Sequence, residues 1–399
     1  MHKKTTSSFE AELKQLFGAH VRLTCLMDEE RMGRRISGID LTQALNPEQA
    51  LLLVELLDSF NILTFPGQHQ ERFKVRYLER LANHFGAPIP HPKNYANYMA
   101  YQRGEESLKP KPFAEQTATV CSNAFPGEVA CLEDAESPAV YIVNNLAQSG
   151  PDKEERIASG LHWHTDIEFE PVPLSTSMFY VHTVPGRRDH DGHWVPNQLP
   201  EEGFYHPDSD LELNERRLAL PLNGETAYAD TAAAFGDLPE EKRCELENTM
   251  VRRRLKKNDE GWLVPLVYTN PRNGVKSLHS PIWASRGKNI APAQVEGLSP
   301  EESRLFFDDL EKHCLDPKYR YDHVHQQGDV TIWSNLATLH NAPPAKSVIN
   351  SVEDARLMYR ISCKGEPSYT LPRKDSEVWI ESNITPPYRS PSAYVDSGS

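Results

Sequence analysis

The sequence predicts a mainly β protein with flanking helices, in which short strands build a sandwich or barrel. Two observations favour this class. From about residue 118 onward, short apolar or alternating segments are separated by turn residues, as in β-sandwiches and barrels. The chain also holds 31 prolines against 21 glycines, and proline is tolerated in loops and at strand edges far better than inside helices. We therefore expect many short strands and few long helices.

The N-terminal fifth carries the clearest helix signals. Asn46 can cap a helix whose first position is Pro47, a residue that suits this position because its missing N–H would be unpaired there anyway. Gly86 is a typical stop for the helix before it. Helices are expected at 9–17, 47–58 and about 70–85, and a buried strand is expected at 61–65.

The remaining elements follow from alternation and from start signals. Ser299 precedes Pro300 and two glutamates, which predicts the start of a helix. Residues 186–223 are rich in charge, histidine and proline, so we expect an inserted surface segment or lid there. The Pro- and Ser-rich residues 385–399 predict a mobile tail. Strands are expected at 139–143, 175–184, 226–229, 329–333 and 356–361, and helices at 236–258 and 299–315.

Charge and composition exclude several classes of partner. The chain has 43 basic and 57 acidic residues, a net charge of −14, which disfavours binding to nucleic acid. No stretch approaches the roughly 18 apolar residues of a membrane span, and no apolar core follows the basic first residues as in a secretory signal. Six cysteines without a CxxC pair favour reduced thiols. We expect a cytoplasmic protein with no nucleic-acid or membrane partner.

The segment Leu-His-Trp-His-Thr-Asp at 161–166 is the best candidate for chemistry. On a strand, His164 and Asp166 would point to the same face, so an imidazole nitrogen and a carboxylate oxygen could converge on one metal. Two neutral nitrogens and one carboxylate leave coordination positions open, which is the pattern of non-haem Fe(II) oxygenases. His340 is the best candidate for the second histidine. In a chain with 16 histidines, the His-x-Asp spacing alone also arises by chance.

A second candidate lies in the alternating segment 356–361. Arg356, Met358 and Arg360 would share one strand face. Two arginines on one face suit a pocket that binds carboxylates bidentately. An edge strand with arginines in solvent would show the same pattern, and the residues alone leave both interpretations open.

Together these segments resemble the Fe(II)- and 2-oxoglutarate-dependent dioxygenases of the taurine dioxygenase and 2,4-dichlorophenoxyacetate dioxygenase type. The resemblance runs from about residue 36 to 366 and rests on six matches in the family's order. These are Gly38-Ile39-Asp40-Leu41; residues 61–68; Phe85-Gly86 with His91-Pro92; Trp163-His164-Thr165-Asp166 with Phe169 and Pro173; Val184-Pro185 with Gly224-Glu225-Thr226; and Trp333, Asn335, His340 and Ala342 with Arg356 and Arg360.

The resemblance implies a double-stranded β-helix, or jelly roll, flanked by helices. It implies a single dioxygenase domain over residues 1–384, with the inserted segment at about 186–223. In the inserted segment and between His340 and Arg356 the chain is longer than the compact members of the family. This extra length favours a specialised substrate, for instance one from secondary metabolism.

Site residues carry over from the family as expectations. Fe(II) would be held by His164, Asp166 and His340. The distal carboxylate of 2-oxoglutarate would pair with Arg356 and accept a hydrogen bond from Thr226.

Two further residues are candidates for contacts to the substrate. Arg360 lies where relatives that take sulfonates or carboxylates bind the substrate anion. Asn144 is a candidate for a second substrate contact, with a role in a turn as the alternative.

The expected activity is hydroxylation of a small, anionic molecule with dioxygen, releasing succinate and CO2. Oxidative cleavage, desaturation or cyclisation would use the same residues. A homo-oligomer stays open. One alternative is a zinc-dependent hydrolase or lyase built on the pair His162 and His164 or on the pair His190 and His193, although the sequence lacks CxxC and HExxH motifs. The other alternative is a non-catalytic jelly-roll binding protein.

Overall fold

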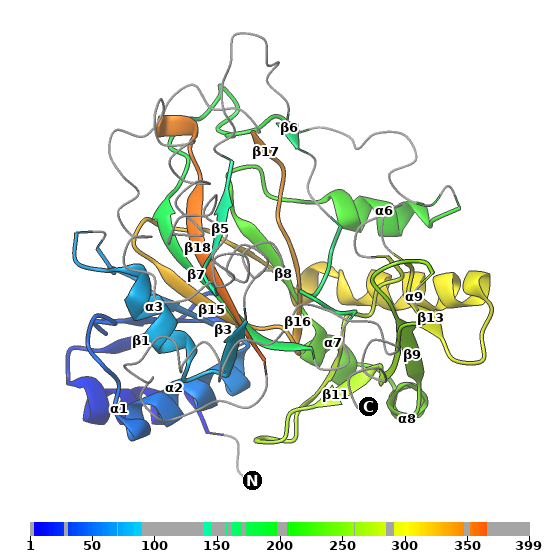
Figure 1. Cartoon of the computed structure of the whole chain (residues 1–399), viewed down its shortest axis with the longest axis horizontal. Coiled ribbons are helices and arrows are strands. Elements are labelled where there is room, and N and C mark those ends of the chain that lie inside the picture. Colours follow the sequence, from blue (N-terminus) through cyan, green and yellow to red (C-terminus); the bar gives the residue numbers. More distant parts are fainter. Residues whose placement is uncertain are drawn as a thin grey trace, which may run out of the picture.

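The computed structural model of the chain (Figure 1) describes residues 4–27, 31–69, 71–89, 139–145, 157–158, 162–169, 173–197, 206, 208–258, 260–284, 291–346 and 352–364. The expected mobile tail at 385–399 lies outside these residues. A membrane-crossing helix needs about 18 or more mainly apolar residues, and the described ranges contain no such helix.

Three N-terminal helices cover one face of a large sheet (Figure 1). They are α1 (Thr6–Phe17), α2 (Pro47–Phe60) and α3 (Val75–Ala82). The signals at the start of α2 act as expected: the Asn46 side chain accepts from the backbone N–H of Gln49, whose side chain bonds back to Asn46. Asn61 ends α2 in the left-handed conformation, with φ of 62°. The expected helix at about 70–85 is real but shorter at both ends.

The large sheet has eight strands, in the order β1-β2-β3-β15-β7-β18-β4, with β5 also paired to β18. Neighbours are antiparallel, except that β2 runs parallel to β3. Because β18 has partners on both sides, the interpretation of residues 356–361 as an edge strand is wrong. The bounds are β1 Arg22–Cys25, β2 Arg34–Ser37, β3 Ile62–Phe65, β4 Ala87–Ile89, β5 Tyr141–Asn144, β7 Leu174–Thr183, β15 Val330–Ser334 and β18 Leu357–Lys364.

A smaller sheet packs against the face of the large sheet that is turned away from the N-terminal helices. It has the order β14-β8-β16 and consists of β14 (Arg320–His323), β8 (Thr226–Asp230) and β16 (Thr338–Asn341). An apolar cluster, called the central cluster below, joins the two sheets. Its buried residues are Met32, Ile62, Phe179, Val181, Tyr228, Trp333 and Met358.

Helices and short strands cover the outer face of the smaller sheet. Ala227 and Ala229 of β8 pack there against α9 (Pro300–Cys314), which begins with a capping box at Ser299 as expected. The expected helix at 236–258 is wrong in its second half. The other elements are β6 Ile157–Ala158, α6 Leu211–Leu218, α7 Thr231–Gly236, α8 Glu240–Glu247, β9 Met250–Arg253, β10 Trp262–Pro265, β11 Val267–Thr269, β12 Lys276–Leu278, β13 Gln294–Val295, β17 Ala345–Lys346, and the 3-10 turns Pro317–Tyr319 and Val352–Asp354.

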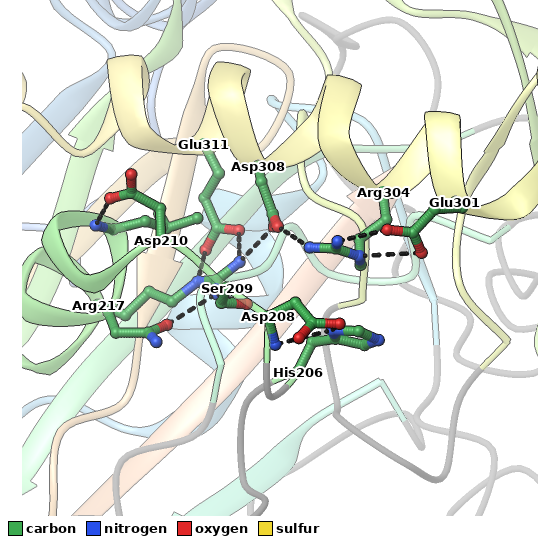
Figure 2. A network of polar contacts seen from close by, with 11 residues as sticks. His206, Asp208, Ser209, Asp210, Arg217, Glu301, Arg304, Asp308 and Glu311 are labelled. Atoms are coloured by element: carbon green, nitrogen blue, oxygen red, sulfur yellow. Dashed lines mark hydrogen bonds and ion pairs between the residues drawn. The ribbon is translucent and has the colours of Figure 1, made fainter.

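Helix α6, which lies within the segment 186–223, is anchored to α9 by buried charges (Figure 2). Arg217 of α6 donates to Asp308 at 3.1 Å and to Glu311 at 2.9 Å. The other oxygen of Asp308 accepts from Arg304 at 2.8 Å. All four side chains are at most 9% exposed. The end of the segment 186–223 therefore packs against α9.

Loss of this anchor should destabilise the fold. We expect Arg217→Ala to lower the free energy of unfolding by about 3 kcal/mol, because it leaves carboxylates buried with fewer cationic partners. Urea unfolding followed by far-UV circular dichroism would measure this. Lys242→Ala, which breaks an exposed pair with Glu245, is the control and should change stability little. Equal changes in the two variants would contradict a structural role for the buried network.

Candidate active site

A single backbone bridge brings the two halves of the expected metal site together. The N–H of His164 donates to the carbonyl of His340 at 3.0 Å, and the N–H of His340 donates back at 2.9 Å. Asp166 follows in a turn, where Ile167 has a φ of 53°. The prediction that His164 and Asp166 share the face of a regular strand is therefore wrong in its local geometry. The side chains converge because one bridge and one turn replace the strand.

His164, Asp166 and His340 offer ligand atoms that all lie within 4.8 Å of one another. Oδ1 of Asp166 lies 3.7 Å from Nε2 of His164 and 3.5 Å from Nε2 of His340. All three residues are buried. Nδ1 of His164 lies 2.8 Å from the carbonyl of His162, so it carries the proton and leaves Nε2 with a lone pair for a metal. Two nitrogens and one carboxylate leave positions open for other ligands.

The second oxygen of Asp166 is held by the protein. Oδ2 accepts from Ser177 Oγ at 3.3 Å and forms an ion pair with Arg360. Ser177 is itself fixed by Asn335, whose side-chain amide donates to Oγ at 2.8 Å. Burial alone would raise the pKa of Asp166, but the charge of Arg360, followed by that of His340, holds this pKa well below its ordinary value. Asp166 is thus an ionised carboxylate with one oxygen free for a cation.

Arg356 lies directly before β18 and is only 6% exposed. Burial lowers its pKa to about 10, so the guanidinium is charged at neutral pH. Its Nε has no hydrogen-bond partner among the described residues. A buried N–H group of a cation that lacks an acceptor is costly, and this position therefore suits an anionic ligand.

Asn145 positions the backbone of Arg356. Its side-chain oxygen accepts from the N–H of Arg356 at 2.7 Å, and its amide donates to the carbonyl of Asp354 at 2.9 Å. Asp354 in turn pairs with Arg187 and Lys346, each at 2.9 Å. The start of the inserted segment thus supports the loop before Arg356. The neighbouring Asn144, which the sequence suggests as a substrate contact, is exposed, and no feature of the sequence distinguishes the two asparagines.

Thr226, the first residue of β8, is 3% exposed. Its hydroxyl lies 2.8 Å from Nε2 of His325. Burial holds the pKa of His325 well below its ordinary value, and His323 and Arg356 act in the same direction, so His325 is neutral. The sequence analysis missed this histidine, although its alternation with the buried His323 is visible in the sequence.

The residues present fit a metal ion together with a small anionic cosubstrate. Several buried polar atoms around this site have no hydrogen-bond partner in the described part of the chain: Arg356 Nε, Tyr228 Oη, His325 Nδ1 and His340 Nδ1. The charges of Asp166 and Arg356 both act on Tyr228. The three metal-binding side chains and Arg356 therefore lie around the same space. The side chains around this space therefore suit an anion bound next to a cation.

The zinc interpretation gains no support from the geometry. His190 is exposed and pairs with the adjacent Asp191. In the described ranges, the one group of three or more candidate ligands within reach of a metal ion is His164, Asp166 and His340.

Comparison with known proteins agrees with this site. The family model described as "Taurine catabolism dioxygenase TauD, TfdA family" matches residues 26–361. Pentalenolactone F synthase of Streptomyces arenae is 25% identical over 234 residues, which cover 58% of this chain and 72% of that protein. The alpha-ketoglutarate-dependent 2,4-dichlorophenoxyacetate dioxygenase of Cupriavidus pinatubonensis is 26% identical over 327 residues, which cover 76% of this chain and 86% of that protein.

Solved structures show the same fold. A putative alpha-ketoglutarate-dependent taurine dioxygenase from Burkholderia xenovorans aligns with a TM-score of 0.52 at 20% identity, covering 87% of this chain and 90% of that one. The crystal structure of AAD-2 in complex with Mn(II) and N-oxalylglycine aligns with a TM-score of 0.52 at 19% identity, covering 87% and 98%. With the family match over most of the sequence, the chain belongs to the TauD/TfdA family and is a non-haem iron dioxygenase that uses Fe(II) and 2-oxoglutarate.

Proposed function

We propose that His164, Asp166 and His340 bind Fe(II), and that Arg356 with Thr226 binds the distal carboxylate of 2-oxoglutarate. The observation that carries this assignment is the buried guanidinium of Arg356, whose Nε lacks a hydrogen-bond partner among the described residues, in the same space as the three metal-binding side chains. We further propose that the two facing sheets form the double-stranded β-helix of the family within a single domain. Their shared central cluster supports this arrangement.

The protein's part in the reaction is orientation and exclusion of water. When bound, Fe(II) and 2-oxoglutarate supply the oxidising chemistry with dioxygen, with succinate and CO2 as the cosubstrate's products. Asp166 would present Oδ1 to the metal while Ser177 and Arg360 restrain Oδ2. Phe179, Met358 and other members of the central cluster keep the surroundings apolar, which strengthens every charge interaction inside.

The substrate that we propose is a small anion, and the reaction that we propose is its hydroxylation. Arg360 is the residue for this role, because its guanidinium has donors beyond the one that engages Asp166 and its side chain is 18% exposed. Relatives named for 2,4-dichlorophenoxyacetate and for (S)-phenoxypropionate act on carboxylates, which supports the assignment. Oxidative cleavage, desaturation and cyclisation would follow from the same first step. The substrate contact of Asn144 and a homo-oligomer stay predictions.

The first test is anaerobic. Fe(II) and 2-oxoglutarate added to the metal-free protein should produce the visible charge-transfer band of the chelated complex. Asp166→Ala should abolish the band by removing a ligand, and Arg356→Ala should weaken cosubstrate binding by about tenfold or more, as expected for a lost charge-assisted pair. Arg22→Ala, an exposed arginine on β1, is the control. A wild-type protein that binds iron without developing the band would refute the proposed cofactor pair.

The role of Asn145 allows a sharper test with its neighbour as control. We expect Asn145→Ala to weaken 2-oxoglutarate binding about tenfold, because the Arg356 backbone loses its side-chain acceptor. Asn144→Ala should leave this binding unchanged. The affinity for Fe(II) alone, measured in the same titrations, should be equal in both variants. If the asparagines prove interchangeable, Asn145 does not position Arg356.

A third test separates the two arginines. Arg360→Ala should weaken the binding of an anionic substrate while leaving 2-oxoglutarate binding nearly intact, and Arg356→Ala should do the opposite. A panel of aryloxycarboxylates and alkyl sulfates, screened by the change that each causes in the charge-transfer band, provides the readout. Equal loss of cosubstrate binding in both variants would show that the two roles have been confused.

A further inference from the structure

Tyr228 is a fully buried tyrosine whose hydroxyl has no hydrogen-bond partner among the residues that the structure describes. It lies in the middle of β8, two residues after Thr226 and directly opposite His340 on β16. Alternate residues of a strand share a face, so Tyr228 and Thr226 belong to the same inner face of the smaller sheet. Tyr228 thus stands between the proposed cosubstrate-binding threonine and a metal-binding histidine.

The surroundings of Tyr228 are those of a ligand pocket. Its ring centroid lies 5.8 Å from that of Trp333 and 6.3 Å from that of His340, which fixes the ring in the central cluster. The charged groups whose fields reach its hydroxyl are Arg360, Asp166 and Arg356. A tyrosine hydroxyl is a neutral O–H group at neutral pH, so it can donate a hydrogen bond to an anion.

Packing alone does not account for a tyrosine at this position. A phenylalanine would fill the same space in the central cluster without a buried polar atom, and buried tyrosine hydroxyls usually find a partner. The nearest explanation is a partner that binds from solution. Nε of Arg356 also lacks a partner in the described part of the chain, so two hydrogen-bond donors around this space lack an acceptor.

We propose that Tyr228 is a third cosubstrate-binding residue, whose hydroxyl donates a hydrogen bond to 2-oxoglutarate between the metal and Arg356. This inference rests on the proposed function of the site. Two residues of a strand span about 7 Å, which is comparable to the length of an extended five-carbon dicarboxylate. A molecule held by the metal at one end and by Arg356 and Thr226 at the other would therefore run past Tyr228.

The test uses Tyr228→Phe, which removes only the hydroxyl. Its matched control is Tyr359→Phe. Tyr359 is as fully buried as Tyr228, but it lies on the face of β18 that packs against the N-terminal helices. Two probes bind without turnover: 2-oxoglutarate with Fe(II) under anaerobic conditions, followed by the charge-transfer band, and N-oxalylglycine with Mn(II), followed by calorimetry. Binding of Mn(II) alone is measured in parallel.

We expect Tyr228→Phe to weaken both probes about tenfold, the effect of one lost hydrogen bond to a charged group. Binding of Mn(II) alone should stay unchanged, and Tyr359→Phe should bind both probes like the wild type. Unchanged probe binding in Tyr228→Phe would overturn the proposal, as would an equal loss of Mn(II) affinity, which would mean that the ring only supports His340. Failure of the wild-type protein to bind either probe would instead refute the proposed function itself.

Discussion

The backbone bridge between His164 and His340 is the contact on which the rest of the site depends. It joins the segment 162–166 to β16, and β16 pairs with β8 so that His340 stands opposite Tyr228. Main-chain hydrogen bonds therefore set the spacing of the metal-binding residues, independently of contacts between their side chains. Only the turn at Asp166 is then needed to bring its carboxylate to the two imidazoles. A site built in this way is preorganised, because the ladder and not the metal holds the ligands together.

The pairing of the strands also determines which charged side chains lie in the space between the two sheets. Asp166 and Arg360 are partners, and aromatic and aliphatic side chains of the central cluster surround them. Arg356 is held in place through its backbone, by Asn145, while its Nε stays unpaired in the described structure. Low local polarity strengthens a satisfied ion pair and penalises an unsatisfied one. The unpaired Nε of Arg356 therefore favours the binding of an anion. The ion pairs of Asp354 hold the loop before Arg356 in place.

Sequence patterns predicted those helices and strands whose signals, such as a capping box or apolar alternation, lie within the element itself. The helix at Pro47–Phe60 begins at its capping box, and the central strands coincide with alternating apolar segments. The prediction of a helix over 236–258 failed at β9, where only one of the two inward-facing residues, Val251, is apolar and the other is an arginine. Arg253 is 3% exposed and donates to the carbonyls of His279 and Ser280 at 2.8 and 2.9 Å. A buried charge satisfied by distant carbonyls breaks the apolar alternation by which a strand is recognised.

The sequence by itself determined the residue types of the site and their family: two histidines, one aspartate and two arginines at recognisable spacings. Tertiary structure alone decided which other side chains complete the site. Asn145 and His325 contact Arg356 and Thr226, which are distant in the chain, and Tyr228 lies opposite His340 on the next strand. The local sequence of each residue does not reveal these partners. Hydrogen-bond partners are chosen by the register between strands, and register is set by the packing of the two sheets rather than by any one segment.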